Sequence, residues 1–155
     1  MAKLLLSLHV LAAVLTVGPV TVAASMFPAS LRQALGPAGD ADALSTLRTL
    51  HRICRVYAGI GIAVPLFGFA TASSLGVLGS AWLIVSILLT AAAAAVLALW
   101  ILPAQEAALA TAERTDGSPL LRSGSQLAML TGVFNLLWAT VTVLMIIRPG
   151  STTGV

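Results

Sequence analysis

One histidine, His9, is the residue of this sequence whose presence is hardest to explain by packing alone. It follows Lys3 by six residues within an apolar run, which places it about 9 Å further along a helix. At that depth an imidazole can be a haem or metal ligand, a proton-transfer group, or a neutral hydrogen-bonding partner between helices. The sequence leaves all three alternatives open, and haem is the cofactor expected if His9 binds one.

Three further polar side chains lie inside apolar runs, namely Ser86 and Thr90 in one run and Asn135 in another. Polar groups in hydrocarbon must find a partner or face water, so they are candidates for a functional site. The Asn135 amide is expected to join two helices by a hydrogen bond. Threonines of the same run are expected to bond back to their own helix: Thr131, Thr140 and Thr142.

A basic cluster precedes the second apolar run and consists of Arg48, His51, Arg52 and Arg55. Such residues at the surface of a membrane can contact lipid phosphates. His51 lies at the start of its run and His9 at the start of the preceding one, so a core about 30 Å thick separates them. One haem or one metal ion is therefore not expected to be held by both histidines.

Most catalytic patterns are missing from the sequence. It contains no phosphate-binding loop, no nucleophile paired with a base, no paired carboxylates and no cluster of zinc ligands. Cys54 has no second cysteine to pair with, and the eight basic residues are scattered over loops, which excludes a nucleic-acid surface. An enzyme of this sequence would have to borrow its chemistry from a cofactor.

The composition places the chain in a membrane. Hydrophobic residues make up 59% and charged residues 8% of the 155 positions, and residues 56–105 contain no Asp, Glu, Lys or Arg. A span needs roughly 20 helical residues, and four runs are long enough: about 4–27, 53–72, 81–102 and 127–147. The sequence predicts an all-α, four-helix transmembrane bundle over residues 1–148, followed by a disordered tail at 149–155.

Several features predict how the spans are joined and shaped. A helix is expected to start near Ala41 and to run into the second span, and residues 105–115 are expected to continue the third. Pro19 and Pro65 should kink the first and the second span. In the second span, Gly59, Gly61 and Gly68 offer surfaces for close helix approach. A weak repeat of span, charged loop and span predicts two parallel helical hairpins.

Arginines predict the orientation of the bundle. The two long connections and their flanks carry Arg32, Arg114 and Arg122 as well as the basic cluster, whereas the opposite side has only Lys3 and Arg148. The positive-inside rule then places both long connections in the cytoplasm and both termini outside.

The opening segment Leu4-Leu5-Leu6-Ser7-Leu8-His9-Val10-Leu11-Ala12-Ala13-Val14-Leu15-Thr16-Val17-Gly18 resembles the first span of a known family. This is a bacterial family of small predicted integral membrane proteins filed as a domain of unknown function. Leu50-His51-Arg52 is similar to the start of its second helix. That family looks distantly like the copper-resistance D group, which implies a role for His9 and, less directly, for His51. Thr16-Val17-Gly18 departs from that pattern, because an aromatic residue commonly precedes the glycine.

These features predict a non-catalytic accessory or small-solute component of a bacterial inner membrane. Its expected partners are the lipid bilayer and other membrane subunits or a second copy of the chain, without nucleic acid. Two alternatives stay open: a haem-binding redox or biogenesis protein that uses His9, and a transporter of a small molecule or metal ion. A transporter would need a water-accessible cavity in the middle of the membrane, near Ser86 and Asn135.

Overall fold

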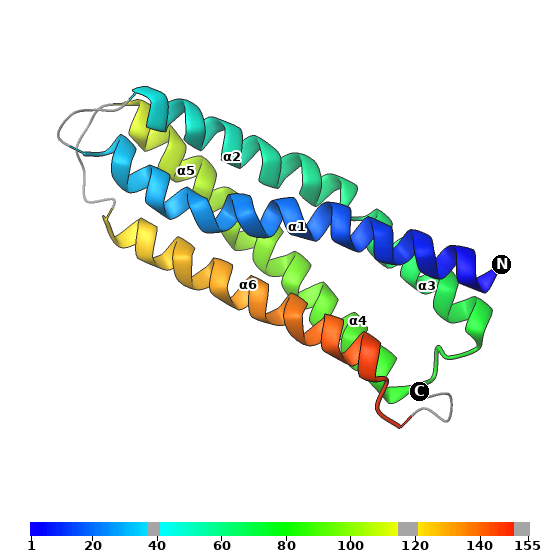
Figure 1. Cartoon of the computed structure of the whole chain (residues 1–155). Helices are drawn as coiled ribbons and strands as arrows, with labels where there is room; N and C mark the ends of the chain where they lie inside the picture. The colour runs from blue at the N-terminus through cyan, green and yellow to red at the C-terminus, as the bar shows by residue number, and fades with distance from the viewer. Residues whose placement is uncertain (37–40, 115–120, 151–155) are drawn as a thin grey trace.

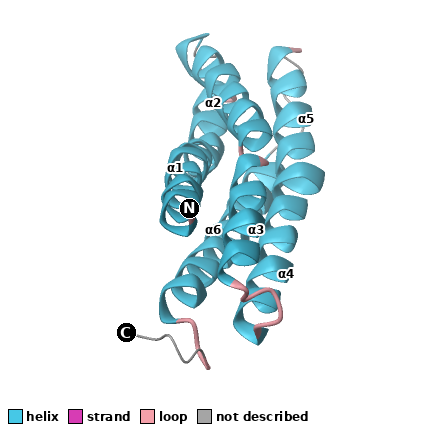
Figure 2. Cartoon of the chain, turned by 90° about the vertical axis from the view of Figure 1, so that its right-hand side faces the viewer, coloured by secondary structure: helices cyan, strands magenta, loops and turns pink. Residues whose placement is uncertain are grey.

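Every described element of the chain is a helix (Figure 2). The structure, a computed structural model, describes residues 1–36, 41–114 and 121–150. Its elements are α1 (Ala2–Ala34), α2 (Ala41–Ile60), α3 (Ala63–Leu75), α4 (Ala81–Ala95), the π-helix η1 (Val96–Ile101), α5 (Leu102–Glu113) and α6 (Leu121–Ile147). By length and composition they form four membrane-spanning helices, at 2–34, 41–75, 81–113 and 124–147. The prediction of an all-α, four-span protein is confirmed.

The four spans run alternately up and down (Figure 1). The start of α1, the end of α6 and the α3–α4 turn lie at one end of the molecule, and the longer connections join the spans at the other (Figure 1). α1 packs along α2 and α3, and α4 packs along α6. The chain therefore consists of two helical hairpins, joined to each other chiefly by contacts between α1 and α6.

Helices extend beyond the predicted spans at the end with the long connections. α1 passes Pro28 and continues to Ala34, because the buried proline ring packs in the core and offsets the one hydrogen bond that it removes. The predicted helical extension from Ala41 into the second span is confirmed as α2. The predicted disordered tail at 149–155 lies, from residue 151 on, outside the described residues.

The main core lies in the half of the bundle nearest the long connections. There Phe27 and Leu31 of α1, Leu47 of α2 and Ile101 of η1 are at most 1% exposed, and all of them pack in one cluster. A second, smaller cluster around Ala72, Trp82 and Leu83 closes the end with the short turn. Only 11–28% of the residues in each apolar span are buried within the chain, so most of the apolar surface faces lipid.

The second span is broken between α2 and α3, as Pro65 predicted. Pro65 has no N–H to donate, and Gly61 and Ile62 form turns in place of helix. The N–H of Ile62 bonds to the Gly59 carbonyl at 3.3 Å, and that of Gly61 to the Tyr57 carbonyl at 2.8 Å. Ala58 lies between these two acceptors, so its carbonyl receives no backbone donor among the described residues.

The third span contains the π-helix η1, in which the N–H of Leu102 bonds to the carbonyl of Leu97, five residues earlier. Pro103 follows at once and cannot donate a hydrogen bond. On a regular helix Gln105 would point about 120° away from Ala93, since each residue turns by about 100°. The π-helix takes up one extra residue, which brings the four residues of a buried stripe to one face: Ala93, Leu97, Ile101 and Gln105.

Candidate functional site

A cavity of about 150 Å³ lies in the middle of the bundle. Its wall is apolar and comes from the middle of all four spans: Thr16, Val17 and Val20 of α1, Tyr57, Ala58, Gly61, Ile62, Val64 and Pro65 of the second span, Thr90, Ala94 and Leu97 of the third, and Phe134 and Trp138 of α6. Both irregular stretches of backbone, the α2–α3 break and the start of η1, thus border the same space. In membrane proteins, non-helical backbone at this depth is tolerated where it lines a cavity or is buried in protein.

The hydroxyls of two cavity residues are used by their own helices. Thr16 donates to the Ala12 carbonyl at 2.6 Å, and Thr90 donates to the Ser86 carbonyl at 2.7 Å. Tyr57 also lines the cavity, and its hydroxyl makes no hydrogen bond within the described part of the chain. The threonines therefore give the wall shape, and their hydroxyls are already used within the protein.

Trp138 lines the cavity, and its buried indole N–H has no partner within the described residues. Its ring meets Phe134 edge to face, with the ring centres 6.3 Å apart. Buried polar groups without a partner are rare in folded proteins, and each needs an explanation. The Trp138 nitrogen has under 1 Å² of accessible surface, so the N–H is packed behind the cavity wall and does not open onto the cavity.

Thr131 does not bond back to its own helix, contrary to the prediction from the sequence. Thr140 and Thr142 bond back to the Leu136 and Trp138 carbonyls at 2.8 and 2.9 Å, as expected. The hydroxyl of Thr131, a residue only 3% exposed, has no partner among the described residues. The prediction was wrong because Thr131 faces the core, where its rotamer is set by packing against neighbouring helices and not by its own backbone.

His9 joins α1 to α3. Its Nδ1 lies 2.9 Å from the Val64 carbonyl, and a carbonyl only accepts, so Nδ1 carries the proton and donates. The imidazole lies against Gly68, where an added Cβ would stand 2.8 Å from Cε1. Of the alternatives for His9, the structure thus shows the hydrogen-bonding partner between helices. His51 contacts α5 and is not brought near His9. It precedes Val64, the partner of His9, by 13 residues, which is about 20 Å along the helix.

The two other predicted polar residues do not line the cavity. Ser86 is fully buried and donates to the Trp82 carbonyl at 2.8 Å. Asn135 donates from Nδ2 to the hydroxyl of Ser25 at 3.4 Å, which links α6 to α1 as expected, while its Oδ1 has no partner in the described ranges. Thr90 alone of this set borders the cavity.

A second polar group is buried where α2 meets α5. Gln105 is fully buried; its Oε1 accepts from Nδ1 of His51 at 3.3 Å and its Nε2 donates to Sγ of Cys54 at 3.7 Å. In the sequence, Gln105 is only the last residue of the uncharged stretch 56–105 and the first of the expected helical extension 105–115. The four-residue spacing of the buried stripe was the available signal. Residues at that spacing share one face of the helix only when a π-helix interrupts the regular turns.

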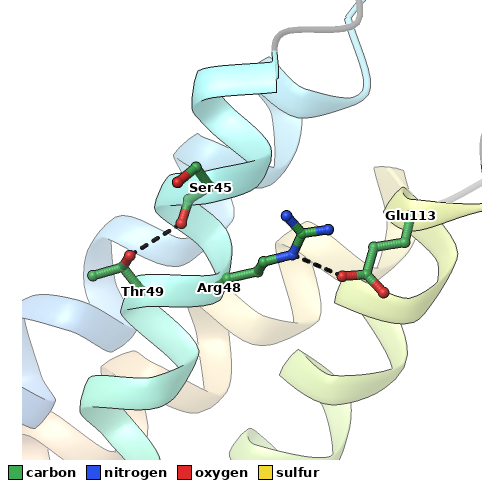
Figure 3. A network of polar contacts seen from close by, with 4 residues as sticks. All are labelled: Ser45, Arg48, Thr49 and Glu113. Carbon is green, nitrogen blue, oxygen red and sulfur yellow. Dashed lines mark hydrogen bonds and ion pairs between the residues drawn. The ribbon is translucent and has the colours of Figure 1, made fainter.

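The basic cluster is divided between two directions. Nε of Arg48 bonds to Oε1 of Glu113 on α5 at 2.9 Å, beside the Thr49–Ser45 hydrogen bond (Figure 3). His51 also turns toward α5, whereas Arg52 and Arg55 are exposed. Arg48 is itself 56% exposed, so all three arginines of the cluster remain accessible at the surface.

Replacement of Glu113 should have a small effect. The side chains of Arg48 and Glu113 are 56% and 41% exposed, and such ion pairs contribute roughly 0–1 kcal/mol. Glu113→Gln is expected to change the free energy of unfolding by less than about 0.5 kcal/mol, as measured in detergent at low and high salt. A loss several times larger would mean that the pair is shielded from water.

The described residues form a helical membrane protein with a cavity between its four spans. Among the described residues, no three His, Cys, Asp or Glu side chains come together to hold a metal ion. No curated protein and no solved structure matches the chain. A family described as "Predicted integral membrane protein (DUF2269)" matches over residues 3–149, nearly the whole chain. The chain is thus a multi-pass integral membrane protein of this family, whose activity is undefined.

Proposed function

We propose that this protein is a non-catalytic, small-solute component of a bacterial inner membrane, which binds a small apolar molecule in the mid-membrane cavity. The observation that carries this proposal is the convergence of a broken helix and a π-helix on one cavity. Broken spanning helices are a recurrent feature of solute sites near the bilayer midplane, and π-helices are frequent at functional sites.

The size of the cavity supports a small ligand. An apolar cavity of about 150 Å³ in a soluble protein binds benzene, and this cavity has the same volume. Its walls hold no charged side chain, which suits an uncharged solute. Exposed residues line part of the cavity, namely Ile62, Pro65 and Ala94, so a molecule dissolved in the lipid can reach it from the side.

Fluorobenzene is a suitable probe of the cavity, followed by ¹⁹F NMR with the full chain in lipid nanodiscs. We expect saturable binding to the wild type. Thr90→Phe fills the cavity and should weaken binding at least tenfold. Thr140→Phe is the matched control, since Thr140 is exposed and bonds back to its own helix as Thr90 does. Equal binding to wild type and Thr90→Phe would contradict the proposal.

The orientation is part of the proposal. The arginines near the long connections support a cytoplasmic location for those connections and an outer location for both termini. Reporter fusions after Ala34 and after Gly76 test this prediction: a cytoplasmic reporter should be active at the first position and inactive at the second. The opposite pattern would reverse the orientation.

The two alternative functions have their own tests. A haem protein requires a Soret band in the purified protein that is lost in His9→Ala, and a colourless preparation excludes stable haem binding.

Copper handling through His9, which the distant likeness to the copper-resistance D group implies, predicts Cu(I) binding that His9→Ala removes. A transporter predicts that cysteines at positions 86 and 135 react with charged thiol reagents, and protection of both contradicts an aqueous pathway there.

A further inference from the structure

The outer face of α2 carries three exposed arginines in a row. Arg48, Arg52 and Arg55 follow one another at spacings of four and three residues, which places them on one side of the helix. All three side chains are exposed. The neighbouring His51 turns away from this row toward Gln105 of α5, so the row consists of guanidinium groups that stay charged at any physiological pH.

Arg52 and Arg55 are the two members of the row without a protein partner. Arg48 bonds through Nε to Oε1 of Glu113 at 2.9 Å. Neither Arg52 nor Arg55 makes an ion pair or a hydrogen bond within the part of the chain that the structure describes. Two like charges one helical turn apart repel each other. An anion that bridges the two guanidinium groups would remove that repulsion.

The same face of α2 becomes apolar directly after Arg55. The stretch 56–105, which has no Asp, Glu, Lys or Arg, begins at the next residue, and Val56 and Ile60 are 49% and 51% exposed. Gly59 lies one turn after Arg55, and nothing stands within 4 Å of the position of its Cβ. A cationic segment is thus followed by an exposed apolar segment in which no side chain at position 59 stands out from the helix.

We propose that Arg52 and Arg55 bind the phosphate of an anionic phospholipid, whose acyl chain lies along α2 past Gly59. Charge complementarity selects the headgroup, because guanidinium forks bond phosphate oxygens in pairs and basic residues beside a spanning helix attract anionic lipids. The apolar segment selects a lipid over a free phosphate, since only a lipid brings a hydrocarbon chain to cover Val56 and Ile60. None of these five residues lines the mid-membrane cavity, so the proposal is independent of the proposed function.

The test is a lipid titration of the full chain in detergent, followed by native mass spectrometry, with phosphatidylglycerol as the probe and phosphatidylcholine for comparison. Each basic residue near a membrane surface contributes about 1 kcal/mol, or roughly fivefold in affinity. We expect Arg52→Gln/Arg55→Gln to weaken phosphatidylglycerol about tenfold or more and to leave phosphatidylcholine unchanged. Arg32→Gln/Arg114→Gln is the matched control, because it removes the same charge from exposed positions at the ends of α1 and α5.

Three results would overturn the proposal. If the control weakens phosphatidylglycerol as much as the Arg52 and Arg55 double variant does, the positive end as a whole attracts the lipid and this site does not exist. If glycerol 1-phosphate, which has no acyl chain, displaces phosphatidylglycerol, the site takes a free anion and not a lipid. If Arg52→Lys/Arg55→Lys binds as tightly as the wild type, the paired guanidinium bonds to phosphate are wrong; we expect this variant to lose about threefold.

Discussion

Gly68→Ala is expected to lower the free energy of unfolding by about 2 kcal/mol, although alanine forms helices better than glycine does. The added Cβ would stand 2.8 Å from Cε1 and 3.0 Å from Nδ1 of His9. The imidazole cannot move away freely, because its Nδ1 donates to the Val64 carbonyl. Either α1 and α3 separate or that hydrogen bond is lost.

Gly59→Ala is the matched control for this substitution. Gly59 lies in the same span, and nothing stands within 4 Å of the position of its Cβ. This variant should be unchanged or more stable by up to about 1 kcal/mol, from helix propensity alone. Thermal and denaturant unfolding in detergent–lipid micelles would compare the two variants directly.

A double-mutant cycle with His9→Ala identifies the imidazole as the cause. Without the ring, Gly68→Ala should no longer destabilise the protein, so the two substitutions should be strongly non-additive. The same loss in both backgrounds would show that Gly68 matters for another reason, such as the curvature of α3. His9→Ala by itself should cost about 1 kcal/mol for the lost hydrogen bond, in addition to lost packing.

Gln105→Ala is expected to cost roughly 2–4 kcal/mol, the largest effect of any single polar residue in the bundle. The side chain is fully buried and links His51 to Cys54. Removing it leaves a cavity in the main core and takes away the acceptor of the His51 N–H. The free energy of unfolding in micelles is the measurement, and Gln126→Ala, at an exposed position of α6, should change it by less than about 0.5 kcal/mol.

Gln105→Leu separates the two causes. Leucine has nearly the same volume, and the partly exposed His51 can turn to water, so only the hydrogen bonds are lost. We expect a cost of about 1 kcal/mol, well below that of the alanine variant. If leucine and alanine were equally harmful, the hydrogen bonds and not the packing would hold α5 against α2.

The glycines show where sequence patterns stop being informative. The composition of the second span predicts that Gly59, Gly61 and Gly68 offer surfaces for close helix approach, because small residues in spans often serve that purpose. Only Gly68 faces another helix closely, through the imidazole of His9. Gly61 lies at the break of the second span, and Gly59 has open space beside it. Which face a glycine presents depends on how the helices are rotated, and composition does not contain that angle.

The sequence by itself determined the solvent, the four spans and their alternating direction. These properties depend on the hydropathy summed over about 20 residues and on the rule that backbone groups in lipid must be satisfied within the helix. No particular contact is needed to predict them. Pro65 likewise predicted a distortion of the second span, because the lost hydrogen bond is local to the chain. The same pattern at Pro19 leaves α1 unbroken from Ala2 to Ala34.

Only the tertiary structure decided which polar groups meet and which are left without partners. Gln105 reaches Cys54 because the π-helix rotates the following turns, and the Trp138 N–H is buried without an acceptor among the described residues. Both facts follow from the rotation and spacing of helices about one another. Those quantities are set by side-chain packing between segments far apart in the sequence, and hydropathy within one segment does not encode them.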